Sequence, residues 1–232
     1  VAILIEDSPA IASNAYFEQR LASVFPYQAD SPYAPTLKDC LYSNELSSSC
    51  TLARLPLIGR TTPNPDIDNI MDRVLVSHAW MGDRFKEFLE NNDPHGDFRA
   101  LLQATTGVVI SYDIRPSFYW AATGAIYLDA DNFWLTADER DTINAAPDYR
   151  SDFGQELQFA MPWRYIKDND YASESLDAAS RESRSAQDGL YRLAALMYHE
   201  LAHANDFFPA GSWNSFDGNT RVLDAALTTT NQ

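Results

Sequence analysis

The chain has 232 residues, 45% of them hydrophobic, and is therefore long enough to bury the core of one domain. Its 33 acidic and 17 basic residues leave a formal net charge of −16, which repels phosphate backbones, so nucleic acid is excluded as an expected partner. No apolar run approaches the roughly 18 residues needed to cross a bilayer, and we expect no membrane-spanning segment.

The first 65 residues are rich in Ser, Pro and Asn and predict a long irregular segment, with one amphipathic stretch at 14–25, that wraps around the rest. Residues 66–232 are then predicted to form the main domain. The chain starts without methionine and stops soon after a predicted helix, which is compatible with a processed piece whose C-terminal part is missing.

Two cysteines, Cys40 and Cys50, lie in the turn-prone stretch DCLYSNELSSSC. A short disulfide loop closes easily there and implies an oxidising compartment, whereas the alternative is a pair of reduced thiols. Together with the acidic balance, the cysteine pair favours an extracytoplasmic location, whether periplasmic, surface-anchored or secreted.

In the middle of the chain, apolar residues at 67–78 and again at 85–89 recur at helical spacing and predict two linked amphipathic helices. NDPHGD predicts a turn, and residues 98–103 a short helix. The stretches TGVVISYDI (106–114) and TGAIYLDA (123–130) predict strands. Two strands alone are marginal in water, so further strands must come from elsewhere in the chain.

Residues 147–187 are polar and aromatic without a steady period and predict a long surface excursion. Ser185 with Asp188 three residues later resembles a capping box and predicts the start of a long helix. Its apolar positions form one stripe, and Pro209 ends it; the stripe consists of Leu190, Leu193, Met197, Leu201, Ala204 and Phe208. TRVLDAAL predicts a short final helix.

The segment HELAH of the long helix contains three polar residues, His199, Glu200 and His203. With 3.6 residues per turn, the two histidines lie one above the other, so both imidazoles can reach one metal ion. Glu200 lies beside them, placed to take a proton from a metal-bound water. The alternative is that these residues decorate the edge of a core helix, although an unpaired carboxylate in a buried segment is costly.

HELAH is an HExxH motif and resembles that of the zincin metallopeptidases, of gluzincin type. The resemblance rests on this one helix. It implies an α+β fold with a small mixed sheet packed on an active-site helix and backing helices. It also implies Zn²⁺ as cofactor, a peptide or protein as substrate, His199 and His203 as metal ligands, and Glu200 as general base. The metzincin continuation is disfavoured because Asp206 and Pro209 occupy its glycine and last histidine positions.

A zincin site needs a third protein ligand, and no Glu, His or Cys follows His203. Asp224 is the tentative candidate within the chain. The ligand can instead lie beyond Gln232, be Asp206, or come from upstream. Asp206 is about 10 Å along the helix from His199, so a role in orienting His203 fits it better than direct ligation.

Zincins generally place an edge strand beside the metal helix, where an extended peptide can add to the sheet. Residues 124–129 are the best candidate for that strand, with Tyr127 facing the cleft as a substrate contact; an ordinary interior strand is the alternative. Tyr119, Tyr198 and Arg115 are equal candidates for stabilising an oxyanion. His78 and His95 are expected to be structural or exposed.

A second function from another class is compatible with the same residues. In that hypothesis the ion braces the helix of a zinc-stabilised binding or envelope protein, and the peptidase site is degenerate. Oligomeric state is not predicted by any feature of the sequence.

Overall fold

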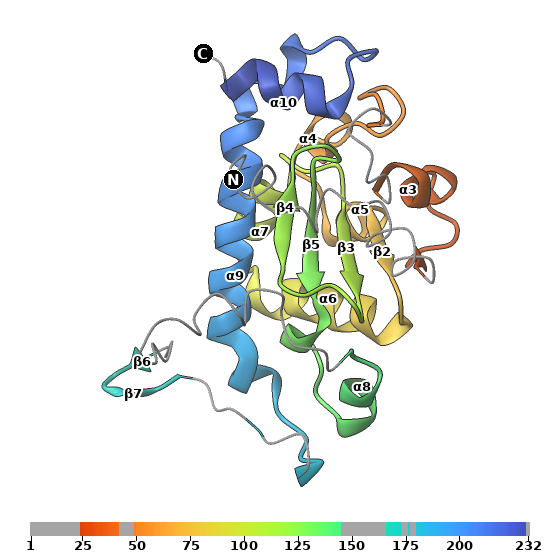
Figure 1. Ribbon diagram of the computed structural model, residues 1–232. Coiled ribbons are helices and arrows are strands. Elements are labelled where there is room, and N and C mark those ends of the chain that lie inside the picture. Colours follow the sequence, from red (N-terminus) through yellow and green to blue (C-terminus); the bar gives the residue numbers. More distant parts are fainter. Residues whose placement is uncertain (1–23, 42–48, 145–165, 173–175, 177–179, 231–232) are drawn as a thin grey trace, which may run out of the picture.

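A computed structural model describes residues 24–41, 49–144, 166–172, 176 and 180–230. Most of the predicted amphipathic stretch at 14–25 and of the surface excursion at 147–187 lies outside these residues, as does anything beyond Gln232. The described part is a mixed α+β structure built on a five-stranded sheet with the order β1-β2-β3-β5-β4 (Figure 1). The strands are β1 (Phe25–Pro26), β2 (Val74–Val76), β3 (Val108–Ser111), β4 (Phe118–Trp120) and β5 (Ala125–Asp129).

The three inner strands β2, β3 and β5 are parallel, and the two outer strands are antiparallel to their neighbours. Every residue of the inner strands is buried, as expected for parallel strands that are covered on both faces. Val76 pairs with Ile110, and Ile110 pairs with Leu128. The predicted strands at 106–114 and 123–130 are therefore confirmed, and β1, β2 and β4 supply the strands that were still needed.

The predicted helix at 67–78 is only partly correct, because α5 (Ile67–Met71) ends early and β2 follows at Val74. Asp66 caps α5 by accepting a hydrogen bond from the Asn69 backbone, so the start of this helix is well defined. Val74 and Leu75 matched the helical spacing by coincidence. A short apolar run that is buried on both faces has no period that would distinguish strand from helix.

One face of the sheet is covered by helices from both halves of the chain (Figure 1). They are α5, α6 (Ala79–Asn92), α7 (Asp97–Leu102), α9 (Ala186–Phe207) and α10 (Val222–Thr230). The predicted helices at 85–89 and 98–103, the long helix and the final helix are thus confirmed. In α9 the Ser185 backbone N–H donates to Asp188 Oδ2 over 2.7 Å, which confirms the capping box.

The apolar stripe predicted for α9 is the surface that packs against the sheet. Leu193, Met197, Leu201 and Ala204 are all buried, and Leu190 is half-buried at the edge of the core. The helix begins at Ala186 and ends at Phe207, two residues before Pro209. This arrangement holds the HELAH segment in the second half of a 22-residue helix anchored along its length.

The opposite face of the sheet is covered by α3 (Ala34–Leu41) and by residues 49–57, which lead into α4 (Ile58–Thr61). A disulfide joins Cys40 to Cys50, with 5.4 Å between the two Cα atoms, which confirms the bridge. Leu37 and Leu55 are fully buried on this side. The described part of the first 65 residues contains β1, α3 and α4 and contributes to the core, and its other residues are irregular.

Smaller elements complete the described part: the 3-10 helices η2 (Ala130–Asn132) and η5 (Ala210–Ser215), α8 (Ala137–Asp141), and a hairpin of β6 (Ile166–Lys167) and β7 (Asp170–Tyr171). Among the described residues, no helix combines the length and the apolar character that a membrane span requires.

Candidate metal centre

The three HELAH residues lie at the border between the exposed and buried sides of α9. His199 is exposed, His203 is half-buried, and Glu200 retains 5% of its surface. At 100° per residue, the side chains follow one another around the helix in the order His199, His203, Glu200. The histidine pair therefore faces outward, and Glu200 lies between that pair and the core.

The two imidazoles approach each other closely. The His199 and His203 Nε2 atoms are 3.2 Å apart, and the rings are nearly perpendicular, with 4.7 Å between their centroids. Two nitrogens bound to one tetrahedral zinc at 2.0–2.1 Å are separated by about 3.3 Å, a value that follows from the tetrahedral angle. The same distance also suits an imidazole–imidazole hydrogen bond, for which one ring must carry its proton on Nε2.

The surroundings of His203 favour its neutral form. Burial lowers the pKa of His203, and the charge of His199 lowers it further, whereas Asp206 acts in the opposite direction. A neutral imidazole offers the lone pair that a metal ion needs. The chemistry of this donor pair therefore fits a borderline-soft divalent ion such as zinc.

The described residues do not supply a third ligand. Across them, no group of three or more His, Cys, Asp or Glu side chains is arranged to hold a metal ion. Asp224, on α10, is ion-paired to Arg221 at 2.7 Å, and this guanidinium lowers the pKa of the carboxyl. Asp206 is exposed on α9, and in the part of the chain that the structure describes no hydrogen bond joins it to His203. The third ligand stays a prediction.

Tyr127 is not placed to contact a substrate, which corrects the prediction made for it. Its strand β5 lies inside the sheet between β3 and β4, so the interior alternative is the correct one. The side chain is 2% exposed, and its hydroxyl donates to the Leu41 carbonyl and shares a hydrogen bond with Thr123. The sheet buries Tyr127 because odd-numbered residues of β5 point to the α3 side, away from α9.

The edge strand beside α9 is β4 (Figure 1). Tyr119 on β4 stacks against Phe207, one helical turn beyond His203, with 5.6 Å between ring centroids. The Tyr119 hydroxyl is buried and has no hydrogen-bond partner among the described residues, and burial strongly raises its pKa. Sequence reasoning assigned the edge position to the wrong strand because FYW is too short to show a period.

Of the other candidates for an oxyanion role, Arg115 contacts other groups and Tyr198 is 47% exposed. Arg115 donates to the Asn144 carbonyl and lies 3.6 Å from Asp129, while Tyr198 packs on Phe98 with 4.8 Å between centroids. His78 precedes α6 with its Nδ1 3.1 Å from the Ser77 hydroxyl, and burial lowers the pKa of this histidine.

His95 is exposed in its turn. His78 and His95 are thus structural or exposed, as predicted.

Sequence reasoning missed a charged cluster at the carboxyl end of β5. Arg192 on α9 binds Asp131 at 3.1 Å, and it lies two helical turns before His199 on the same face. Burial alone would raise the pKa of Asp131, but Arg192 and the Trp134 indole lower it overall. No local sequence motif predicts this ion pair, because Asp131 and Arg192 are 61 residues apart in sequence.

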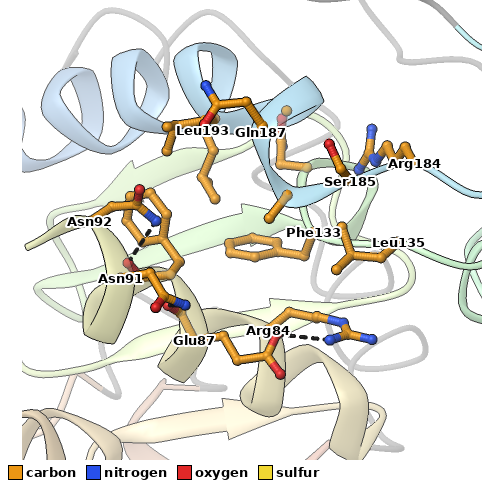
Figure 2. A pocket seen from close by; sticks show the side chains of 15 residues that line it. Arg84, Glu87, Asn91, Asn92, Phe133, Leu135, Arg184, Ser185, Gln187 and Leu193 are labelled. Atoms are coloured by element: carbon orange, nitrogen blue, oxygen red, sulfur yellow. Dashed lines mark hydrogen bonds and ion pairs between the residues drawn. The ribbon is translucent and has the colours of Figure 1, made fainter.

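Sequence reasoning also missed a cavity of about 240 Å³ between α6, the loop after β5 and the start of α9 (Figure 2). A second hollow of about 340 Å³ lies between Tyr27 and α6. Neither is lined by His199, Glu200 or His203.

Comparisons of the chain with protein-family models, with curated proteins and with solved structures find no significant match.

Proposed function

We propose that the protein is a zinc-dependent metallopeptidase whose metal ion is held by His199 and His203. The observation that carries the proposal is the 3.2 Å separation of the two Nε2 atoms on one face of an anchored helix. That distance agrees with two ligands of one tetrahedral ion, for which about 3.3 Å is expected. A third ligand would come from outside the described residues, or from an aspartate that changes its present partner.

When bound, zinc supplies a Lewis acid that polarises the scissile carbonyl and makes a bound water acidic enough to react near neutral pH. His199 and His203 hold the ion as neutral imidazoles. Glu200 takes the proton from the attacking water and returns it to the leaving amine. Its buried position next to the histidine face supports this role, because a carboxylate fixed by its surroundings is held in place for proton transfer.

The arrangement of β4 supports a peptide as the substrate. β4 is the edge strand of the sheet, the position at which an extended polypeptide can add. Tyr119 and Trp120 are each only 4% exposed, so Phe118 is the most accessible residue of this strand. β4 also lies beside the helix that carries the histidines, and Tyr119 contacts that helix directly. A substrate strand on β4 would therefore run past the proposed metal site.

The decisive experiment replaces Glu200 by Gln, which keeps the shape of the side chain and removes its basicity. Zinc retained after dialysis is measured by mass spectrometry, and hydrolysis of unfolded casein is followed with and without a chelator. We expect Glu200→Gln to keep its zinc and to lose at least about a hundredfold in rate, the usual effect of removing a general base.

The matched control is His203→Ala, which we expect to lose both zinc and activity. Hydrolysis by Glu200→Gln at the parental rate would exclude the proposed role of this carboxylate. A parent protein that binds zinc but cleaves neither casein nor shorter peptides would exclude the peptidase itself.

A second candidate is a metal-braced, non-catalytic binding protein. One observation favours it: neither of the two described cavities is lined by His199, Glu200 or His203. In that case zinc would stabilise the fold without any hydrolysis that a chelator could block.

We further infer that the protein works in an oxidising compartment outside the cytoplasm. The Cys40–Cys50 bridge supports this location, because such bonds persist where thiols are not kept reduced.

A further inference from the structure

The cavity of Figure 2 has the size and lining of a site for one apolar group. Its apolar lining includes Phe88, Phe133 and Leu193, each at most 6% exposed, and the half-buried Leu190. At about 240 Å³ it is smaller than the roughly 300–1,000 Å³ of typical small-molecule sites. Dry apolar cavities of about 150 Å³ already accept a benzene ring, so a single large side chain fits here.

The rim of the cavity offers hydrogen-bond acceptors and carries two arginines, Arg84 and Arg184. Asn91 and Asn92 use their Nδ2 groups to donate to the Glu87 and Phe88 carbonyls. Their carboxamide oxygens remain available to N–H groups. Arg84 is bound by Glu87, at 2.7 Å, and by Glu139.

The second cation of the rim, Arg184, donates to the Trp134 and Asp131 carbonyls. These two hydrogen bonds leave Arg184 with further N–H donors, so the rim has one cationic side chain without an ion pair among the described residues. A peptide group next to an apolar side chain finds suitable acceptors.

Gly189 enlarges this cavity. It lies inside α9, where a glycine costs about 1 kcal/mol relative to alanine. A Cβ atom at this position would meet only the Asn132 carbonyl oxygen, at 3.7 Å, which is ordinary contact. Packing against neighbouring residues thus does not require a glycine at this position. The missing side chain leaves open space at the cavity wall.

We propose that the cavity is a substrate subsite that takes up one large apolar side chain of a polypeptide. This inference rests on the proposed function, because α9 carries both the cavity wall and the histidines. Leu193 lies six residues before His199, about 9 Å along the helix axis. Leu193 also lies about 120° around the helix from His199, so an extended peptide needs about three residues or more for this path, and the side chain belongs at least about three positions from the cleaved bond.

Binding is tested first, without turnover, in the full chain carrying Glu200→Gln. N-acetyl-leucinamide and N-acetyl-alaninamide are titrated separately while backbone amide NMR signals are recorded. We expect the leucine probe to shift the Gly189 and Leu193 signals saturably and to bind about tenfold more tightly than the alanine probe. Equal binding of both probes, or shifts elsewhere only, would overturn the inference.

Filling the cavity supplies the matched variant. Gly189→Leu places a side chain in the space and is expected to weaken the leucine probe about tenfold. Ala100→Leu, which adds the same side chain at an exposed position of α7, is expected to leave binding unchanged. Gly189→Ala removes the conformational freedom of glycine but adds only a methyl group. It therefore separates the effect of backbone freedom from the effect of filling the cavity.

Cleavage by the zinc-loaded parent protein is the second test. In peptides that carry leucine or alanine about three or more residues from the bond, leucine should raise kcat/KM, and Gly189→Leu should remove that preference. Cleavage with an unchanged preference in Gly189→Leu would exclude the subsite and leave the peptidase standing. A parent protein without peptidase activity would exclude both.

Discussion

At the scale of single residues, burial decides the chemistry of the ionisable groups around α9. Asp129 ends β5 with 7% of its surface exposed, and burial raises the pKa of its carboxyl to about 6; the charge of Asp131 adds to this effect. Arg115 lies 3.6 Å away and offsets only part of it. The carboxyl therefore opposes folding once it is ionised.

The sign of this effect gives a pH-dependent prediction for Asp129→Asn. Below about pH 3 the carboxyl is protonated in both folded and unfolded chains, so the substitution should change little. Between about pH 3 and pH 6 the unfolded chain releases its proton first, and the cost of Asp129 grows until the folded pKa is passed. A difference between 3.8 and about 6 corresponds to about 3 kcal/mol, the upper limit of this cost.

We expect Asp129→Asn to raise the free energy of unfolding at pH 7.5 by at most about 3 kcal/mol, because the pKa of about 6 already includes the effect of Arg115. Urea unfolding curves at pH 4, 5, 6 and 7.5 measure it. A gain that is equal at every pH, or a loss at pH 7.5, would show that Asp129 ionises freely in the folded protein.

At the scale of elements, one covalent bond holds α3 to the segment that leads into α4. Cys40 and Cys50 are ten positions apart, and both are buried. Closing a loop of this length removes freedom mainly from the unfolded chain. The bridge therefore strengthens the layer that covers the face of the sheet opposite α9.

Replacing both cysteines by alanine should lower the free energy of unfolding by about 2 to 3 kcal/mol. Denaturant unfolding of the double variant, compared with the parent protein under non-reducing conditions, measures the loss. The parent protein in a strong reductant serves as the control and should weaken by a similar amount. No change in either sample would mean that the loop is already constrained by its packing.

At the scale of the whole molecule, the helix that carries the proposed metal site packs against several parts of the fold. The histidines are on α9, which packs on the sheet and on α7 and α10. A ligand that binds only the folded chain stabilises all of it by mass action, by about 2.7 kcal/mol at a hundredfold excess over its Kd. Zinc should therefore raise the unfolding temperature of the entire protein.

Thermal unfolding followed by circular dichroism tests this effect, with chelator alone and then with excess zinc. We expect zinc to raise the Tm of the parent protein by several degrees and to leave His199→Ala unchanged. Magnesium, which prefers oxygen ligands, is the control ion. An equal response of the parent protein and His199→Ala would place the zinc elsewhere.

Local sequence patterns predicted the elements that have a clear period or cap. The long helix α9, its capping residues and its apolar stripe are where the pattern placed them, and so are β3 and β5. Local patterns failed for β2, which was predicted as helix, and for β4. Both strands are three residues long and take their identity from the strands they pair with.

For the candidate site, the sequence by itself determined that His199 and His203 share a helical face, because a spacing of four residues is a local property of α-helices. Only the tertiary structure decided that Tyr127 is buried, that β4 is the edge strand, and that Asp224 pairs with Arg221. It alone created the cavity beside Gly189, whose walls come from three separate segments. The reason is physical: helix periodicity depends on neighbours in sequence, whereas burial, sheet order and cavities depend on contacts between residues that are far apart in sequence.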